Sequence, residues 1–142
     1  MQLATWNVNS LNVRLPQVLA WLATNPVDVL ALQELKLTDD KFPVQAFTDA
    51  GYHAQWFGQK TYNGVALLSK APAADVIKNI PGFDDEQSRV LCATIDGVRV
   101  IGAYFPNGAV THRRLSSGRR TALGGSSQPG RLRRAGYPVR PA

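Results

Sequence analysis

The chain has 142 residues, a length typical of one globular domain, and 44% of them are hydrophobic. It contains no run of about eighteen apolar residues, so no membrane-spanning helix is predicted, and its single cysteine, Cys92, excludes an internal disulfide. The net charge of +6 is unevenly distributed: residues 1–111 hold eight Lys and Arg against ten Asp and Glu, a net −2, whereas residues 112–142 hold eight Arg and no acid, a net +8.

The first part of the chain shows a strand, a helix and a second strand in succession. Gln2–Val8 has the composition of a strand, and Arg14–Thr24 carries apolar residues at helical spacing. Asp28–Gln33 is a nearly continuous apolar run, as expected for a strand covered on both faces. A right-handed strand–helix–strand crossover makes the two strands parallel. The sequence therefore predicts an α/β fold that begins with a βαβ unit.

Further elements are predicted towards the middle of the chain. A short helix is predicted over Pro43–Ala50, and two strands over Tyr52–Phe57 and Gly64–Ser69. A hairpin is predicted from Arg89–Ile95 and Val98–Phe105. The hairpin strands flank Asp96-Gly97, a dipeptide typical of two-residue turns. Cys92 falls in an apolar run of this hairpin, so we expect its thiol to be buried.

The composition changes abruptly near Thr111. Residues 112–142 consist mainly of Arg, Gly, Ser, Ala and Pro, and contain no Ile, Phe or Trp. Too few large apolar side chains are present to offset the entropy lost on ordering such a segment. We therefore divide the chain into a folded portion, residues 1–111, and a basic tail, residues 112–142, that is either disordered or read in a shifted frame.

Two oxygen-bearing side chains lie at the ends of the predicted parallel strands. Asn7 is near the end of the first strand, and Glu34 directly follows the second. Neighbouring parallel strands end at the same edge of a sheet, where open α/β sheets bind ligands, so the two side chains should converge. A carboxylate and an amide suit Mg²⁺, which keeps several of its waters. On spacing alone, however, a surface Glu and an Asn that caps the backbone explain such a pair more often.

Four sequence blocks resemble exonuclease III and the related AP (abasic-site) endonucleases, in the family's order and at about its spacing. The blocks are WNVNSL (Trp6–Leu11), QELK (Gln33–Lys36), GQKTYNGVALLSK (Gly58–Lys70) and GAYFPNG (Gly102–Gly108). The resemblance extends from Met1 to about Ala109. It implies the N-terminal half of the four-layered endonuclease/exonuclease/phosphatase sandwich, an α/β fold with a mixed sheet and flanking helices.

The resemblance also implies an activity and a partner. Members of this family are Mg²⁺-dependent DNA-repair nucleases that cleave duplex DNA 5′ to abasic sites and remove nucleotides from 3′ ends. The implied cofactor is therefore Mg²⁺, with Mn²⁺ as an alternative, and the implied partner is double-stranded DNA. We expect a cytoplasmic protein, because the N-terminus lacks the pattern of a secretory signal. We also expect the protein to be a monomer.

Three residues of this chain match positions of the family's active site. Glu34 is implied as the metal-binding carboxylate, and Asn7 as a residue beside the metal and the scissile phosphate. Tyr104 is implied as a hydroxyl near the phosphate, although a tyrosine in a strand more often packs in a core.

Arg89 matches a position that contacts the DNA backbone in the family. Its side chain could instead pair with the acidic segment Asp84–Glu86, which precedes it in the chain. Lys36, Lys60 and Tyr62 are weaker candidates for the same edge.

Two later motifs of the family do not occur in residues 112–142: a Gly-Asp-(Phe/Met)-Asn strand and a Ser-Asp-His segment. We expect the second sheet of the sandwich to be missing as well. Because such catalytic groups act as a unit, the chain should have little or no nuclease activity. One alternative is a non-catalytic fragment that binds nucleic acid through its Arg-rich tail. A relative acting on inositol phosphates or lipids is a third possibility, and the four blocks fit it less well.

Overall fold

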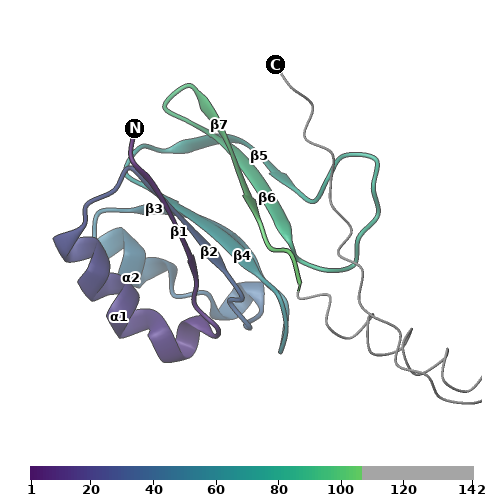
Figure 1. Cartoon of the computed structure of the whole chain (residues 1–142), viewed down its shortest axis with the longest axis horizontal. Helices are drawn as coiled ribbons and strands as arrows, with labels where there is room; N and C mark the ends of the chain where they lie inside the picture. The colour runs from purple at the N-terminus through teal and green to yellow at the C-terminus, as the bar shows by residue number, and fades with distance from the viewer. Residues whose placement is uncertain (107–142) are drawn as a thin grey trace, which may run out of the picture. The chain divides into compact units, whose positions relative to one another are not determined.

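The structure, a computed structural model, describes residues 1–106, and the predicted basic tail lies outside them. Within the described residues, two β-sheets face each other and two α-helices pack on the far side of the first sheet (Figure 1). The predicted α/β class is thus confirmed. Two sheets with few helices match part of the implied sandwich.

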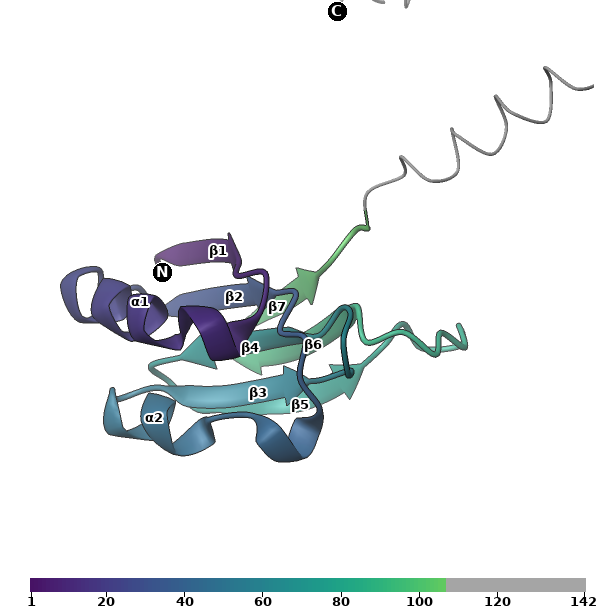
Figure 2. The same ribbon diagram turned by 90° about the horizontal axis from the view of Figure 1, so that it is seen from below.

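The first sheet is mixed, with strand order β1-β2-β4-β3 (Figure 2). Its strands are β1 (Leu3–Asn7), β2 (Val29–Gln33), β4 (Val65–Ser69) and β3 (His53–Phe57). β1 and β2 are parallel, as predicted from the βαβ pattern, and β4 is antiparallel to both β2 and β3. β2 and β4 occupy the centre of this sheet, which explains their nearly continuous apolar sequences.

Two α-helices and one short 3₁₀ helix connect these strands. α1 (Leu11–Thr24) begins earlier than the predicted Arg14, so Pro16 lies inside the helix. The short 3₁₀ helix η1 (Asp39–Lys41) precedes α2 (Val44–Asp49). Gly51 follows α2 with a φ of 86°, a left-handed conformation that suits glycine at a helix end.

A second sheet is present, contrary to our prediction that it would be missing. It has strand order β5-β6-β7, with β5 (Ala73–Lys78), β6 (Val90–Ile95) and β7 (Val98–Ala103), all antiparallel. The predicted hairpin around Asp96-Gly97 forms its β6–β7 pair, and both turn residues have positive φ. β5 was not predicted because its pairing with β6 is interrupted between Ala74 and Ile77.

Two apolar cores lie on opposite faces of the first sheet. On one face, Leu30, Leu32 and Leu68 pack against helix residues such as Val18 and Phe47. On the other face, the second core lies between the two sheets; its buried residues are Val29, Val65, Leu67, Leu91, Ala93 and Ile95. Each fully buried Leu, Ile or Phe stabilises the fold by roughly 1.5–3 kcal/mol relative to an exposed side chain.

The outer face of the second sheet differs from its inner face. Cys92 alternates with the inward-facing Leu91 and Ala93 of β6, and it is half-buried rather than buried as predicted.

Among residues 1–106, no helix combines the length and the apolar character needed to cross a membrane.

Candidate metal and phosphate site

The loops that follow β1 and β2 run side by side beyond the ends of the two parallel strands. The Val8 N–H donates to the Gln33 carbonyl at 3.0 Å, the Ser10 N–H to the Glu34 carbonyl at 2.8 Å, and the Leu11 N–H to the Leu35 carbonyl at 3.0 Å. Backbone hydrogen bonds thus extend from β1 to the first residue of α1. They hold Glu34 in place against the segment that contains Asn7.

The segment before β4 supports Glu34 from the other side. The Leu35 N–H donates to the Gly64 carbonyl at 3.2 Å, and the Lys36 N–H donates to the Asn63 carbonyl at 3.1 Å. Gly64 has a φ of 89°, and a Cβ atom at this position would lie 2.9 Å from the Cβ of Leu35. Only glycine fits this position without displacing Leu35.

Glu34 and Lys36 themselves adopt the left-handed backbone conformation, with φ values of 56° and 54°. Residues other than glycine pay of order 1–2 kcal/mol for this conformation, and Asn or Asp tolerate it better than Glu or Lys. The backbone hydrogen bonds on both sides of the loop hold the two residues there. Such local strain is found disproportionately at functional sites.

The side chains of Asn7 and Glu34 meet at this edge, as predicted. The Asn7 amide nitrogen donates to Glu34 Oε1 at 3.0 Å, and the Asn7 amide oxygen accepts the Asn9 N–H at 3.1 Å. Lys36 Nζ lies 3.5 Å from Glu34 Oε2 and donates to the side-chain oxygen of Asn9 at 2.5 Å. Asn9 was not singled out from the sequence, although it lies in the same WNVNSL block as Asn7.

Tyr104 joins this group from the second sheet. It directly follows β7, and its N–H donates to the Arg89 carbonyl at 2.8 Å, which extends the β6–β7 pairing by one step. The neighbouring Glu34 carboxylate raises the pKa of Tyr104. Burial raises it further. Tyr104 therefore keeps its proton at neutral pH and can act as a hydrogen-bond donor.

The same contacts keep Glu34 ionised. Hydrogen bonding from Asn7 lowers the pKa of Glu34, burial opposes this effect, and contacts with Tyr104 and Lys36 lower the pKa further. The Glu34 side chain is 20% exposed, so one part of the carboxylate remains open to solvent. The site thus presents a negatively charged, accessible carboxylate surrounded by hydrogen-bond donors.

Arg89 forms an ion pair within the chain. Its guanidinium donates twice to Asp85 Oδ2, from Nε at 3.0 Å and from Nη2 at 2.5 Å. The Gln87 N–H and then Arg89 lower the pKa of Asp85. This is the pairing with the acidic segment that the sequence left open as an alternative, and a contact between Arg89 and phosphate stays a prediction.

A basic cleft of about 500 Å³ opens next to Lys36. Lys36, Lys41 and Lys60 line it, together with the polar side chains of Asn12 and Thr61. Lys36 and Lys60 were weak candidates from the sequence, whereas Lys41 and Asn12 were not singled out. Three lysines around one cleft favour a phosphate or another anion as its ligand.

The residues at this edge suit Mg²⁺ better than a transition metal. Among residues 1–106, no group of three or more His, Cys, Asp or Glu gathers. A single accessible carboxylate beside an amide suits Mg²⁺, which retains several waters and binds one or two carboxylates together with substrate phosphates. Asn7 turns its nitrogen towards Glu34, so in this arrangement it orients the carboxylate.

The comparisons with known proteins identify relatives of this chain. The profile of the endonuclease/exonuclease/phosphatase family matches residues 4–139. Exodeoxyribonuclease III from Haemophilus influenzae is 34% identical over 113 residues, which cover 76% of this chain and 42% of that protein.

Solved structures show the same relationship. A 3′-5′ exonuclease from Neisseria meningitidis is 58% identical with a TM-score of 0.74, over 76% of this chain and 43% of that protein. A variant of a 3′ phosphatase from Neisseria, bound to a product DNA hairpin, is likewise 58% identical with a TM-score of 0.74, over 76% and 42% of the two chains. An AP endonuclease from Archaeoglobus fulgidus is 39% identical with a TM-score of 0.73, over 76% and 42% of the two chains.

The chain thus spans about two fifths of the length of these relatives. The similarity covers most of its own residues and includes both sheets. The chain belongs to the endonuclease/exonuclease/phosphatase family, with exonuclease III and AP endonucleases as its homologues.

Proposed function

We propose that this chain carries the magnesium-binding half of the active site of a DNA-repair phosphodiesterase of the exonuclease III type. Its substrate is duplex DNA with abasic sites or 3′ ends. The observation that carries the proposal is the contact of Asn7 with the Glu34 carboxylate at 3.0 Å, at an edge where Glu34 also raises the pKa of the neighbouring Tyr104. A hydrogen-bonded carboxylate at the carboxyl ends of two parallel strands is suited to hold a hard cation.

Each residue has a separate role in this proposal. Glu34 would hold Mg²⁺, and Asn7 keeps the carboxylate oriented and ionised. The protonated Tyr104 hydroxyl donates a hydrogen bond to a phosphate oxygen. When bound, Mg²⁺ stabilises the negative charge that develops on the phosphate and on the leaving oxygen during hydrolysis.

The basic cleft supports DNA as the partner. Lys36 contacts Glu34 and also lines the cleft, so a phosphate backbone bound by the three lysines would pass directly beside the carboxylate. Lysine and arginine contacts to phosphates position a duplex without reading its sequence. This suits a repair enzyme that acts on a lesion or an end, and a DNA-bound relative is consistent with it.

Magnesium binding tests the proposal directly. Glu34→Gln removes the charge but keeps the size of the side chain, and should weaken Mg²⁺ binding by at least about tenfold in isothermal titration calorimetry. The control is Asp40→Asn, which removes an exposed carboxylate from η1. Equal Mg²⁺ affinity in the parent and in Glu34→Gln would refute the proposed site. Mn²⁺ can replace Mg²⁺ in the same assay if a paramagnetic signal is preferred.

We also propose that the chain by itself hydrolyses DNA little or not at all. Residues 112–142 contain no Asp or Glu and a single His, His112, so they offer no carboxylate to position the attacking water. Removing one member of a catalytic group costs most of the rate. A nicking assay on duplex DNA with an abasic site in Mg²⁺ would measure this. Rates close to those of the Neisseria meningitidis exonuclease would contradict it.

A further inference from the structure

Arg89 directly precedes β6, and its backbone is tied to the candidate site. The Tyr104 N–H donates to the Arg89 carbonyl at 2.8 Å, and the Gly64 N–H donates to the carbonyl of Ser88 at 2.9 Å. Gly64 also supports the loop that carries Glu34, through its own carbonyl. The side chain of Arg89 therefore starts beside Tyr104, at the edge where Glu34 lies.

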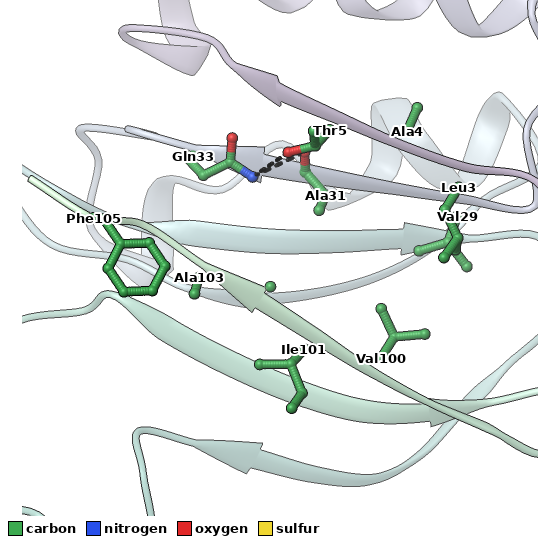
Figure 3. Close-up of a pocket in the computed structure, with 11 residues that line it drawn as sticks. Leu3, Ala4, Thr5, Val29, Ala31, Gln33, Val100, Ile101, Ala103 and Phe105 are labelled. Carbon is green, nitrogen blue, oxygen red and sulfur yellow. Dashed lines mark hydrogen bonds between the residues drawn. The ribbon is translucent and has the colours of Figure 1, made fainter. Parts of the chain in front are cut away.

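The cavity between β1, β2 and β7 offers no charged side chain at this edge. It has a volume of about 390 Å³, and the residues that line it, all within the described part of the chain, are uncharged (Figure 3). Its polar side chains, Thr5 and Gln33, hydrogen-bond to each other at 2.9 Å. A cation for a phosphate beside Tyr104 therefore comes from Arg89 or from the basic cleft, and not from this cavity.

The residue before Arg89 is firmly anchored. Ser88 is only 4% exposed. Its N–H donates to the side-chain oxygen of Gln59 at 3.0 Å, and its hydroxyl donates to the Gly58 carbonyl at 2.9 Å. Both contacts join Ser88 to the segment after β3. The backbone from which the Arg89 side chain extends is thus held by two neighbouring segments.

Asp85 is an anchored carboxylate in the segment between β5 and β6. Its Oδ1 accepts the Gln87 N–H at 3.0 Å, and its backbone carbonyl accepts the side-chain amide of Asn79 at 2.8 Å. Its Oδ2 accepts two hydrogen bonds from Arg89, from Nε at 3.0 Å and from Nη2 at 2.5 Å. A carboxylate that is fixed in this way also fixes the direction of the guanidinium.

The guanidinium keeps donors for a second partner. It carries more N–H groups than the two that donate to Asp85. The side chain of Arg89 is 28% exposed, whereas that of Asp85 is 17% exposed. Because Arg89 is the more accessible member of the pair, a phosphate can reach it while the contact with Asp85 persists.

We propose that Asp85 is a positioning residue, which holds the Arg89 guanidinium in the direction that a DNA phosphate beside Tyr104 requires. The ion pair and the phosphate contact, which the sequence presented as alternatives, then form together. An arginine loses side-chain entropy when it binds a ligand, and a guanidinium that a carboxylate already holds loses less. The proposal rests on the proposed function, because it assumes DNA as the ligand.

Competition between Asp85 and DNA is the opposite interpretation. If Asp85 occupied Arg89 in place of a phosphate, its removal would strengthen DNA binding, and the loss of a negative charge would act in the same direction. The anchoring of Asp85 and the greater exposure of Arg89 favour positioning instead. The two interpretations differ in the sign of one measurable change.

Fluorescence anisotropy of a short labelled DNA duplex measures this sign. Asp85→Asn removes the charge, can still accept the Gln87 N–H, and should weaken binding by the full chain about threefold. The matched control, Asp84→Asn, removes the same charge from the exposed neighbouring residue and should not weaken binding. In the Arg89→Gln variant, adding Asp85→Asn should cause no further loss. The basic tail is identical in all variants, so its contribution cancels.

A salt series and a second variant separate positioning from structural damage. The dependence of log affinity on log salt should become shallower by about 0.9 in both Asp85→Asn and Arg89→Gln, because each loses one phosphate contact. Arg89→Lys keeps the charge and leaves Asp85 in place, but it lacks the planar fork and should bind DNA more weakly than the parent. Circular dichroism must show that the compared variants fold equally.

The outcomes decide the proposal. Unchanged or tighter DNA binding by Asp85→Asn would overturn it. An equal loss with and without Arg89 would do so too, because the effect would then not act through Arg89. Parent-like binding by Arg89→Gln or Arg89→Lys also contradicts it. These measurements omit Mg²⁺, so a failure here is distinct from a failure of the metal site, which Mg²⁺ binding tests.

Discussion

Asn7 and Glu34 lie 27 positions apart in the sequence, yet a hydrogen bond joins their side chains. Parallel pairing of β1 and β2 places Asn7 beside Gln33, so the following residue, Glu34, lies just beyond the strand end. The pairing could be predicted from the βαβ pattern. The contacts of Lys36 with Asn9 and Glu34 could not, because they depend on two left-handed residues that a sequence pattern does not reveal.

Tyr52 provides a pH-dependent test of the fold at the scale of one residue. Its buried hydroxyl donates to the Val27 carbonyl at 3.0 Å, and burial, with a smaller effect of Asp28, raises the pKa of Tyr52 above the ordinary 10.0. The folded state therefore holds this proton more tightly than the unfolded state. The resulting stability is fully present below pH 10 and is lost as the pH rises through the pKa of the folded state.

We expect the free energy of unfolding of the parent chain to fall above about pH 10. Tyr52→Phe should flatten this decline and should lower stability at neutral pH by about 1 kcal/mol through loss of the hydrogen bond. The pKa of Tyr104 is also raised, so the free energy of unfolding of Tyr52→Phe should still fall somewhat with rising pH. Urea unfolding at several pH values measures both effects, with Tyr62→Phe, at an exposed ring, as the control. An unchanged slope in Tyr52→Phe would contradict the assignment.

At the scale of elements, the loop between β2 and η1 is held from both sides, by the loop after β1 and by the segment before β4. Gly64→Ala would place a methyl group 2.9 Å from the Leu35 Cβ, next to Glu34. We expect a destabilisation of about 2 kcal/mol or more, from the positive φ and the overlap together. Mg²⁺ affinity should fall as well, because Leu35 must move.

Gly51→Ala is the matched control for this prediction. Gly51 has nearly the same φ, 86°, but nothing lies within 4 Å of its added Cβ. Its substitution should cost about 1 kcal/mol, from the backbone conformation alone, and should leave Mg²⁺ affinity unchanged. Thermal unfolding followed by circular dichroism compares the two variants. If both lose the same stability and Mg²⁺ binding is unaffected, the contact between Gly64 and Leu35 does not support the site.

Most elements could be predicted from the sequence, and the exceptions have local causes. The strands β1, β2 and β4 are apolar enough to be recognised, and Asp96-Gly97 marks the β6–β7 hairpin. β5 escaped prediction because Asp75 adopts a positive φ within an irregular pairing, which breaks the alternation of side chains. Without β5, the hairpin was not recognised as part of a second sheet. Tyr104 was assigned through resemblance, since its position in a strand pattern suggests only packing.

At the scale of the whole molecule, charge is separated along the chain. Residues 1–111 carry a net −2 and residues 112–142 a net +8. If the eight arginines contact duplex DNA, affinity should fall steeply with salt, with a slope of about −0.9 for each phosphate neutralised. Replacing all eight by Gln should abolish most of this slope and keeps the chain length. Fluorescence anisotropy over a range of salt concentrations measures it.

The comparison with a second variant separates the tail from the basic cleft. Changing Lys36, Lys41 and Lys60 to Gln removes the positive charge of the cleft and leaves the tail intact. If DNA binding in the presence of Mg²⁺ depends on the cleft, the triple lysine variant should lose it. If DNA binding at low salt depends on the tail, the variant with eight Gln should lose that binding instead. Unchanged binding in the eight-Gln variant would exclude the tail as a nucleic-acid-binding segment.

At positions 34 and 36 the backbone is left-handed, so the residues that fold at the lowest cost there differ from those that the proposed metal site needs. Asn and Gly adopt such φ values at lower cost than Glu and Lys. In a library randomised at these two positions and sorted only for yield of folded protein, we expect Asn and Gly to become enriched. Sorting the same library for metal capture should return Glu at position 34. Recovery of Glu and Lys in both sorts would mean that the two residues serve the fold itself.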